Sequence, residues 1–230
     1  KRNRFGIFTL VLILSLCRCT KDKIPISSSS DVQKEQDTLP EAEITPEEEP
    51  FLYGYQNLNE EEKTRYRQIL AGIENYEDSV TVEACSEEEI NKVSNLVFVD
   101  HPEIFWLEQQ NYSFNQKENS DVDLLELNLV YNMGKDEIED TKQQIEAKAE
   151  EWSQELSNCE NEYDKIKYVY EFLGKNVLYD SESENNQNIQ SVFLNQSTVC
   201  MGFAKATQYL LVRNGIFCTL VTGKVMPENM

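Results

Sequence analysis

The segment TVCMGFAKATQYLLVRNGI, residues 198–216, constrains the fold of this chain more than any other stretch. Three small residues allow a helix here to lie close to its neighbours, and they are Gly202, Ala204 and Ala206. Asn214 and Gly215 then form a helix-ending signal. Residues 216–222 form a short apolar run that is typical of a buried strand. The segment therefore predicts a closely packed helix that leads into a buried strand.

Two capping signatures predict helices in the first half of the chain. Asn59 with Glu62, and Ser86 with Glu89, have the spacing of a capping box. Apolar residues follow each signature at helical spacing, and they are Tyr66, Ile69, Leu70 and Ile73 for the first helix and Ile90, Val93 and Val97 for the second. We expect the second helix to end before Pro102, because the residue before a proline disfavours helical geometry.

The other predicted elements complete an α+β pattern. Strands are predicted over residues 79–84, 111–117 and 123–131, and helices over 135–157 and 161–174, with Gly174 as the C-cap of the last. A composition break near residues 133–136 suggests a boundary. The fold class predicted is α+β: a small N-terminal α+β domain over residues 51–133, with a helical region and a small sheet, followed by a mostly helical region over 134–230.

The first residues carry an export signature. Three basic residues precede an apolar run from Phe5 to Leu16, which is shorter than the roughly 20 residues of a membrane-spanning helix. Residues 1–20 are therefore predicted to be a signal or lipoprotein-type segment. Cys17 or Cys19 is the candidate for lipid attachment, although neither follows the small residue expected before a lipidated cysteine. Plain secretion and an uncleaved anchor are the alternatives.

Residues 21–50 are rich in serine, proline and acidic residues and poor in large apolar ones. Such a segment cannot bury enough surface to offset the entropy of ordering it. We expect a disordered acidic linker that tethers a globular part to the membrane. The predicted location is extracytoplasmic, either anchored to the cell membrane or secreted.

Charge and cysteine content exclude several classes of function. The formal net charge is −21, which argues against a nucleic-acid partner because such proteins need a basic face. No CxxC motif or Cys/His cluster is present, so neither a metal site nor another cofactor is expected. Of the four cysteines outside the signal region, Cys85 and Cys159 could pair in a disulfide, and Cys218 falls in the predicted strand as a core residue.

Cys200 stands at the first turn of the predicted helix, with Ser197 and Thr198 before it as turn and cap residues. The free N–H groups and the positive end of the helix dipole stabilise a thiolate there. The N–H of Cys200 could also bind an oxyanion. The alternative is a buried, inert thiol, because free cysteine is among the most buried residue types.

Three stretches of the chain together resemble the bacterial transglutaminase-like superfamily, whose core is papain-like. They are the helix EYDKIKYVYEFLGKNVLYD at residues 162–180, the run from Gln187 to Val192, and the Cys-Gly-aromatic-Ala helix that begins at Cys200. The upstream segment VFVDHPEIFWL, residues 97–107, resembles the N-terminal region often attached to this domain in secreted bacterial proteins.

The resemblance implies that Cys200 is the nucleophile of a Cys-His-Asp triad. It would attack a carboxamide or peptide carbonyl and form a thioester, which water or an amine then resolves. The family's histidine and aspartate lie on strands after the cysteine helix, beyond Met230. The sequence is therefore expected to be a fragment that is inactive by itself, and the substrate is expected to be a protein or peptide amide at the cell surface.

Other polar residues receive weaker assignments. Gln187 or Asn188 could assist an oxyanion hole, by analogy with papain-like enzymes, but a local helix cap is the competing interpretation. His101, the one histidine of the chain, is upstream of the cysteine and is expected to fill a turn. Asp180 also precedes the cysteine and does not fit the family's aspartate.

Two further functions compete with the thiol enzyme. One is a non-catalytic binding or scaffolding lipoprotein on the same fold, because a fold does not fix a function. The other is a structural surface module held by disulfides, which requires Cys200 to be oxidised.

Overall fold

The computed structural model describes residues 39–108, 114–117 and 124–223. These described residues belong to one compact unit. The predicted signal segment, with Cys17 and Cys19, lies outside the described residues. Within the described ranges, no helix is both long and apolar enough to cross a bilayer. The boundary near residues 133–136 stays a prediction.

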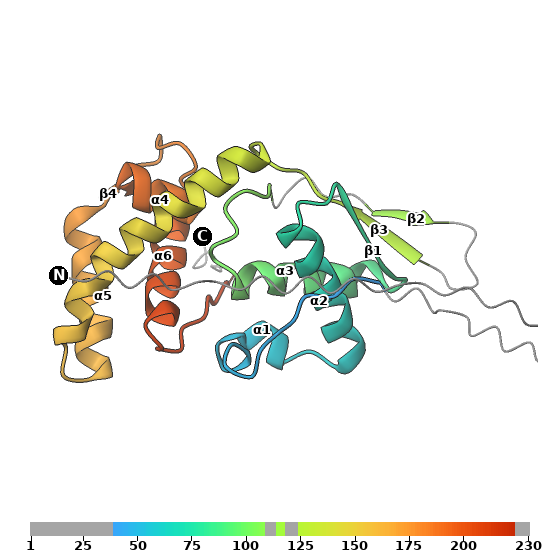
Figure 1. The fold of residues 1–230 in the computed structure, drawn as a ribbon, viewed down its shortest axis with the longest axis horizontal. Coiled ribbons are helices and arrows are strands. Elements are labelled where there is room, and N and C mark those ends of the chain that lie inside the picture. The colour runs from blue at the N-terminus through green and yellow to red at the C-terminus, as the bar shows by residue number, and fades with distance from the viewer. Residues whose placement is uncertain (1–38, 109–113, 118–123, 224–230) are drawn as a thin grey trace, which may run out of the picture. The chain divides into compact units, whose positions relative to one another are not determined.

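The first half of the described chain is a layer of helices against a small sheet (Figure 1). Its elements are the 3-10 turn η1 (Glu49–Phe51), helices α1 (Tyr53–Gln56), α2 (Glu60–Glu74) and α3 (Glu87–Asp100), and strands β1 (Ser79–Glu83), β2 (Phe114–Lys117) and β3 (Leu124–Asn128). The strands are antiparallel in the order β1-β3-β2, and Val80 of β1 faces Leu127 of β3 in the register. Helix α2 packs against both α3 and β1.

Local sequence signals place the ends of α2 and α3 correctly. The side chain of Asn59 accepts a hydrogen bond from the Glu62 N–H, and the Glu62 carboxylate accepts one from the Asn59 N–H, so the capping box is complete. Ser86 caps α3 by accepting from the Glu89 N–H. Helix α3 ends at Asp100, before Pro102, as predicted.

Residues 39–50 differ from the disordered linker predicted for 21–50. Ala42 and Ile44 are partly buried against the core. The Ala42 N–H donates to the Arg67 carbonyl at 2.9 Å, and Glu41 forms an ion pair with Arg67 at 2.7 Å. These few apolar and charged contacts attach the segment to α2. They depend on partners elsewhere in the chain, so the composition of the segment does not reveal them.

The second half is mainly helical. In chain order it contains α4 (Lys135–Ser153), the 3-10 turn η2 (Gln154–Asn158), α5 (Glu162–Asn176), β4 (Leu178–Tyr179), the π-helical turn η3 (Ser191–Asn195), β5 (Ser197–Thr198) and α6 (Cys200–Arg213). Helices α5 and α6 pack together, α4 lies against η3, and the two-residue strands β4 and β5 pair in parallel (Figure 1). The predicted inner face of the α4 region is buried, and it comprises Ile138, Ile145, Ala149, Trp152 and Leu156.

Two predicted features of this half are wrong. Helix α5 does not end at Gly174 but continues to Asn176, and Val177 is its C-cap. Residues 216–222 do not form a strand. A strand exists only where another strand accepts its ladder hydrogen bonds, and no described strand pairs with this run. Phe217 is 50% exposed and Val221 is 89% exposed, so the run is only partly buried.

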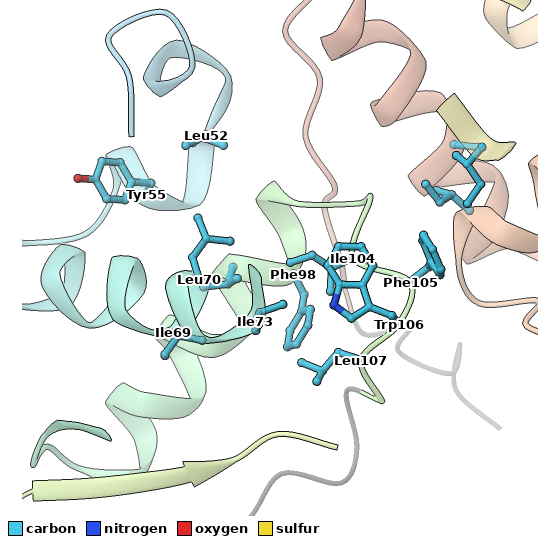
Figure 2. Close-up of a cluster of buried hydrophobic side chains, with 14 of the residues drawn as sticks. Leu52, Tyr55, Ile69, Leu70, Ile73, Phe98, Ile104, Phe105, Trp106 and Leu107 are labelled. Carbon is cyan, nitrogen blue, oxygen red and sulfur yellow. The ribbon is translucent and has the colours of Figure 1, made fainter. Parts of the chain in front are cut away.

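The segment after α3 joins the two halves through one hydrophobic core. Ile104, Phe105 and Trp106 are each at most 3% exposed, as the sequence predicted. Figure 2 shows Ile104 and Trp106 beside Ile73 of α2 and Phe98 of α3. Phe105 lies on the other side of Trp106, and their ring centroids are 5.2 Å apart in an edge-to-face contact. Phe105 lines the cavity that also contains residues of α6. This segment therefore places the α3 end next to the cysteine helix.

A buried carboxylate fixes the short helix α1 at the same junction. The Asp100 side chain accepts hydrogen bonds from the N–H groups of Gly54 and Tyr55, both at 2.8 Å, and from the Tyr66 hydroxyl at 3.1 Å. Asp100 is 6% exposed. The Asp100 carboxylate, although distant in the sequence, thus accepts hydrogen bonds from N–H groups in the first turn of α1. These groups have no acceptors within the helix.

Candidate active site

Cys200 is the first residue of α6 and is exposed to solvent. The N-cap residue is Val199, which gives no side-chain hydrogen bond to the helix. The first N–H groups of a helix have no intrahelical acceptors, so this end offers uncapped donors beside the thiol. Because Cys200 is exposed, it is not the buried thiol of the alternative interpretation. Its role as a nucleophile remains a prediction.

The turn that leads into Cys200 is held by a hydroxyl network. The Thr198 hydroxyl donates to the Asn186 carbonyl at 2.8 Å and accepts from the Ser191 hydroxyl at 2.7 Å. The Val199 N–H also reaches the Asn186 carbonyl, at 3.4 Å. Thr198 and Ser191 are both 0% exposed. The sequence suggested that Thr198 caps α6, but its hydroxyl does not bond to that helix. It instead connects β5 to the preceding loop.

Gly202 allows α6 to lie against this network. A Cβ at position 202 would be 1.9 Å from the Thr198 hydroxyl oxygen and 3.0 Å from the Asn186 carbonyl oxygen. Only a residue without a side chain fits at that separation. The small residue in the sequence motif thus sets the position of the helix end that carries Cys200.

An aromatic pair lies on the face of α6 that carries the thiol. Phe203 is one turn after Cys200, so the two side chains share a face. Its ring stacks on Tyr179 of β4, with ring centroids 6.5 Å apart and an interplanar angle of 9°. Tyr179 is 70% exposed and the neighbouring Leu178 is 73% exposed. An apolar group bound beside Cys200 could therefore contact this pair.

Gln187 and Asn188 lie in the loop whose Asn186 carbonyl is bonded to Thr198, so the loop adjoins the start of α6. Asn188 acts locally, since its side-chain oxygen accepts from the Gln190 N–H at 2.9 Å. That bond closes a local turn before η3, and the part of Asn188 in an oxyanion hole stays a prediction. Gln187 is exposed and lines a cavity with Met201. Its assistance to an oxyanion hole stays a prediction.

His101 is placed away from the thiol. The carbonyl of Val99, two residues earlier, accepts from the Gln208 side chain at 2.7 Å. His101 itself lines a cavity with Tyr209 and Arg213. Gln208 is eight positions after Cys200, which corresponds to about 12 Å along a helix axis. His101 Nδ1 is 2.7 Å from the Glu103 carboxylate, as expected for a turn-filling residue.

We expect His101→Gln to leave the alkylation rate of Cys200 within about twofold of the original while lowering stability in acid. Burial acts to lower the pKa of His101, but the carboxylates of Glu103, Asp100 and Glu74 outweigh it and hold that pKa above 6.5. The pair's contribution is thus complete below pH 6.5 and is lost as the pH rises through the folded-state pKa. Thermal unfolding at pH 5.5 and 8, with iodoacetamide labelling, tests both parts, and a large fall in Cys200 labelling would make His101 a participant.

All four described cysteines are free thiols: Cys85, Cys159, Cys200 and Cys218. The Cys85–Cys159 disulfide considered from the sequence is not formed, and the disulfide-held structural module loses its support. Burial raises the pKa of both Cys85 and Cys218. Cys218 is half-buried, but it lies in the run that forms no strand.

Sequence reasoning missed one residue of this region, Lys205. It is 5% exposed although it is charged. Met201, Lys205 and Gln208 recur at helical spacing, so a charge on a stripe that packs inward was the available signal. In the part of the chain that the structure describes, no group of three or more His, Cys, Asp or Glu side chains is placed to hold a metal ion.

Comparison with known proteins agrees with the resemblance seen in the sequence. The model of the transglutaminase-like superfamily matches residues 150–230. No curated protein matches the chain. A solved structure titled "Crystal structure of a TGase" is similar at 16% identity and a TM-score of 0.29, over 58% of this chain. This chain spans 41% of the length of that one.

Proposed function

Since residues 150–230 of the chain belong to the transglutaminase-like superfamily, we propose that the protein is a thiol enzyme acting on protein or peptide amides through Cys200. The observation that carries the proposal is the exposed thiol on the first residue of α6, beside uncapped N–H groups. The match to the superfamily model includes this helix. The finer features, a papain-like core with α6 as its cysteine helix, belong to the same proposal.

The proposed reaction begins with attack of the Cys200 thiolate on a carboxamide or peptide carbonyl carbon. The carbon–sulfur bond forms, the carbon–nitrogen bond breaks, and the amine or ammonia leaves with a proton. Water then hydrolyses the thioester, or an amine replaces the sulfur. The Cys200 N–H is a candidate donor to the oxyanion. In the proposed reaction the proton acceptor is not His101 but a histidine oriented by an aspartate, both of which the resemblance implies on strands after the cysteine helix.

Export belongs to the proposal as well. The basic and apolar residues within 1–20, and Cys17 or Cys19 as lipid-attachment sites, support a location at the cell membrane or outside it. The substrate would then be an extracytoplasmic protein or peptide.

The first test is selective alkylation of the chain near neutral pH. We expect iodoacetamide to modify Cys200 at least about tenfold faster than Cys159, because the Cys200 thiol is exposed beside the uncapped N–H groups of a helix start, whereas Cys159 is only partly exposed. Burial raises the pKa of Cys218 and thereby lowers its thiolate fraction, so that residue should react slowly too. Mass spectrometry of peptides gives each rate. Equal rates at all cysteines would contradict the proposal.

A second test asks for the acyl-enzyme itself. A p-nitrophenyl ester of a glutamine peptide has a leaving group that needs no protonation, so acylation does not depend on a general acid. We expect a burst of one equivalent of p-nitrophenol and an adduct on Cys200. Cys200→Ala should show no burst, and Cys159→Ala is the matched control that keeps it. An adduct elsewhere, with none on Cys200, would remove the assignment of the nucleophile.

A further inference from the structure

A cavity of about 570 Å³ lies beside the first turns of α6. One wall is the segment after α3, another is the loop before the cysteine helix, and the helix contributes Met201 and Lys205. The polar lining residues are Glu108, Asn132, Asn185, Asn186, Gln187, Asn188 and Lys205. This volume is within the range of cavities that bind small molecules or single groups of a larger ligand.

Lys205 is the unusual member of this lining. It is 5% exposed, and in the described part of the chain its ammonium forms no hydrogen bond or ion pair. A buried charge without a partner is unfavourable, and a residue that served packing alone would be apolar. Burial lowers the pKa of Lys205 to about 8, while the negative charge of Glu103 acts in the opposite direction.

The amide side chains around Lys205 supply hydrogen-bond donors as well as acceptors. The Asn186 amide donates to the Ser181 carbonyl at 2.7 Å, and the Asn188 amide to the Phe105 carbonyl at 3.4 Å. Each amide nitrogen carries two N–H groups, so each keeps a second donor. Gln187 adds another amide. The charged groups near Lys205 are Glu103, which is bonded to His101, and the exposed Glu108.

The cavity adjoins the position of the thiol. Its Met201 directly follows Cys200 in the chain. Its loop is fixed to the residues just before Cys200, because the Asn186 carbonyl accepts from Thr198 at 2.8 Å and from the Val199 N–H at 3.4 Å. A peptide held by its acyl group at the thiol could therefore extend a neighbouring group into the cavity.

We propose that Lys205 and the amides around it bind a carboxylate of the peptide substrate near the bond that Cys200 attacks. An ammonium and neighbouring amide donors form charge-assisted hydrogen bonds to such a group. The site itself follows from the geometry, whereas its use by a substrate rests on the proposed function. The carboxylate is either an acidic side chain or a chain terminus.

The experiment measures binding in the Cys200→Ala background, so the result does not depend on whether Cys200 is a nucleophile. The probes are N-acetylglutamate α-amide, N-acetylglutamine and N-acetylglutamine α-amide, which carry a side-chain carboxylate, a terminal carboxylate and neither. Amide chemical shifts of Met201 and Asn186 report binding at the cavity. We expect one charged probe to bind at least about tenfold more tightly than the uncharged one, and that probe identifies the source.

Lys205→Met tests the role of the charge, with the exposed Lys167→Met as the matched control. Lys205→Met should remove the preference for the charged probe and also raise the thermal midpoint, because it deletes a buried, unpaired charge. A merely structural lysine would not show this opposed pair of effects. For the original chain, binding should weaken as the pH rises above 8, where Lys205 loses its proton.

Three outcomes would overturn the proposal. The uncharged probe could bind as tightly as both charged ones. Lys205→Met could retain the preference while remaining folded. No probe could bind below about 10 mM, which corresponds to negligible recognition. If one of these outcomes occurred while Cys200 in the original chain was still labelled selectively, the carboxylate subsite would be rejected. The proposed thiol enzyme would then be retained.

Discussion

Gly202→Ala should destabilise the protein by about 1–3 kcal/mol, although alanine is the better helix former by about 1 kcal/mol. The added Cβ would be 1.9 Å from the Thr198 hydroxyl oxygen. That oxygen cannot move aside, because it is bonded to both Ser191 and the Asn186 carbonyl. Either α6 or β5 must shift. Denaturant unfolding measures the loss, and Cys200 labelling should change with it because Cys200 lies at the shifted helix end.

Gly174→Ala provides the matched control. Gly174 is also within a helix, and a Cβ there would meet nothing within 4 Å. The same substitution should therefore stabilise the folded protein by up to about 1 kcal/mol, since alanine lowers the backbone entropy lost on folding and creates no clash here. A Thr198→Ala background should reduce the cost of Gly202→Ala, because it removes the nearest atom of the clash. Equal effects at the two glycines would show that the close contact does not form.

The helices were predictable because their signals are local. Asn59 and Glu62 are three residues apart, and the bonds that cap α2 follow from their spacing. The apolar stripe of α2 likewise needs only the 3.6-residue period. Gly174 misled the prediction because a glycine ends a helix only where the backbone turns left-handed, and the chain stays helical to Asn176.

Features that depend on distant partners could not be predicted in the same way. The run 216–222 has strand composition, but strand formation depends on a neighbour that supplies the ladder. Cys200 could be placed at a helix start from its own neighbourhood. The burial of Lys205, by contrast, depends on the segment around Phe105, about 100 positions earlier in the chain. The position of Cys200 at a helix start was thus predictable, and the cavity beside it was not.

The junction that places this cavity depends on Asp100, and Asp100→Ala should cost at least about 3 kcal/mol. It would leave the N–H groups of Gly54 and Tyr55 and the Tyr66 hydroxyl without their acceptor, at about 1–3 kcal/mol for each group that stays buried.

Tyr66→Phe serves as a milder variant that distinguishes the loss of hydrogen bonds to Asp100 from a general loss of packing. It removes one donor and keeps the carboxylate, so we expect a loss of only about 0.5–1.5 kcal/mol. The exposed Asp140→Ala should change stability by less than about 0.5 kcal/mol. Hydrogen exchange gives the local readout, because Asp100→Ala should release the Gly54 and Tyr55 amides while Tyr66→Phe should not. Unchanged protection of these amides in Asp100→Ala would mean that α1 is held by its apolar contacts alone. In that case Asp100 would not be what fixes α1 at the end of α3, where His101 and the segment lining the Lys205 cavity begin.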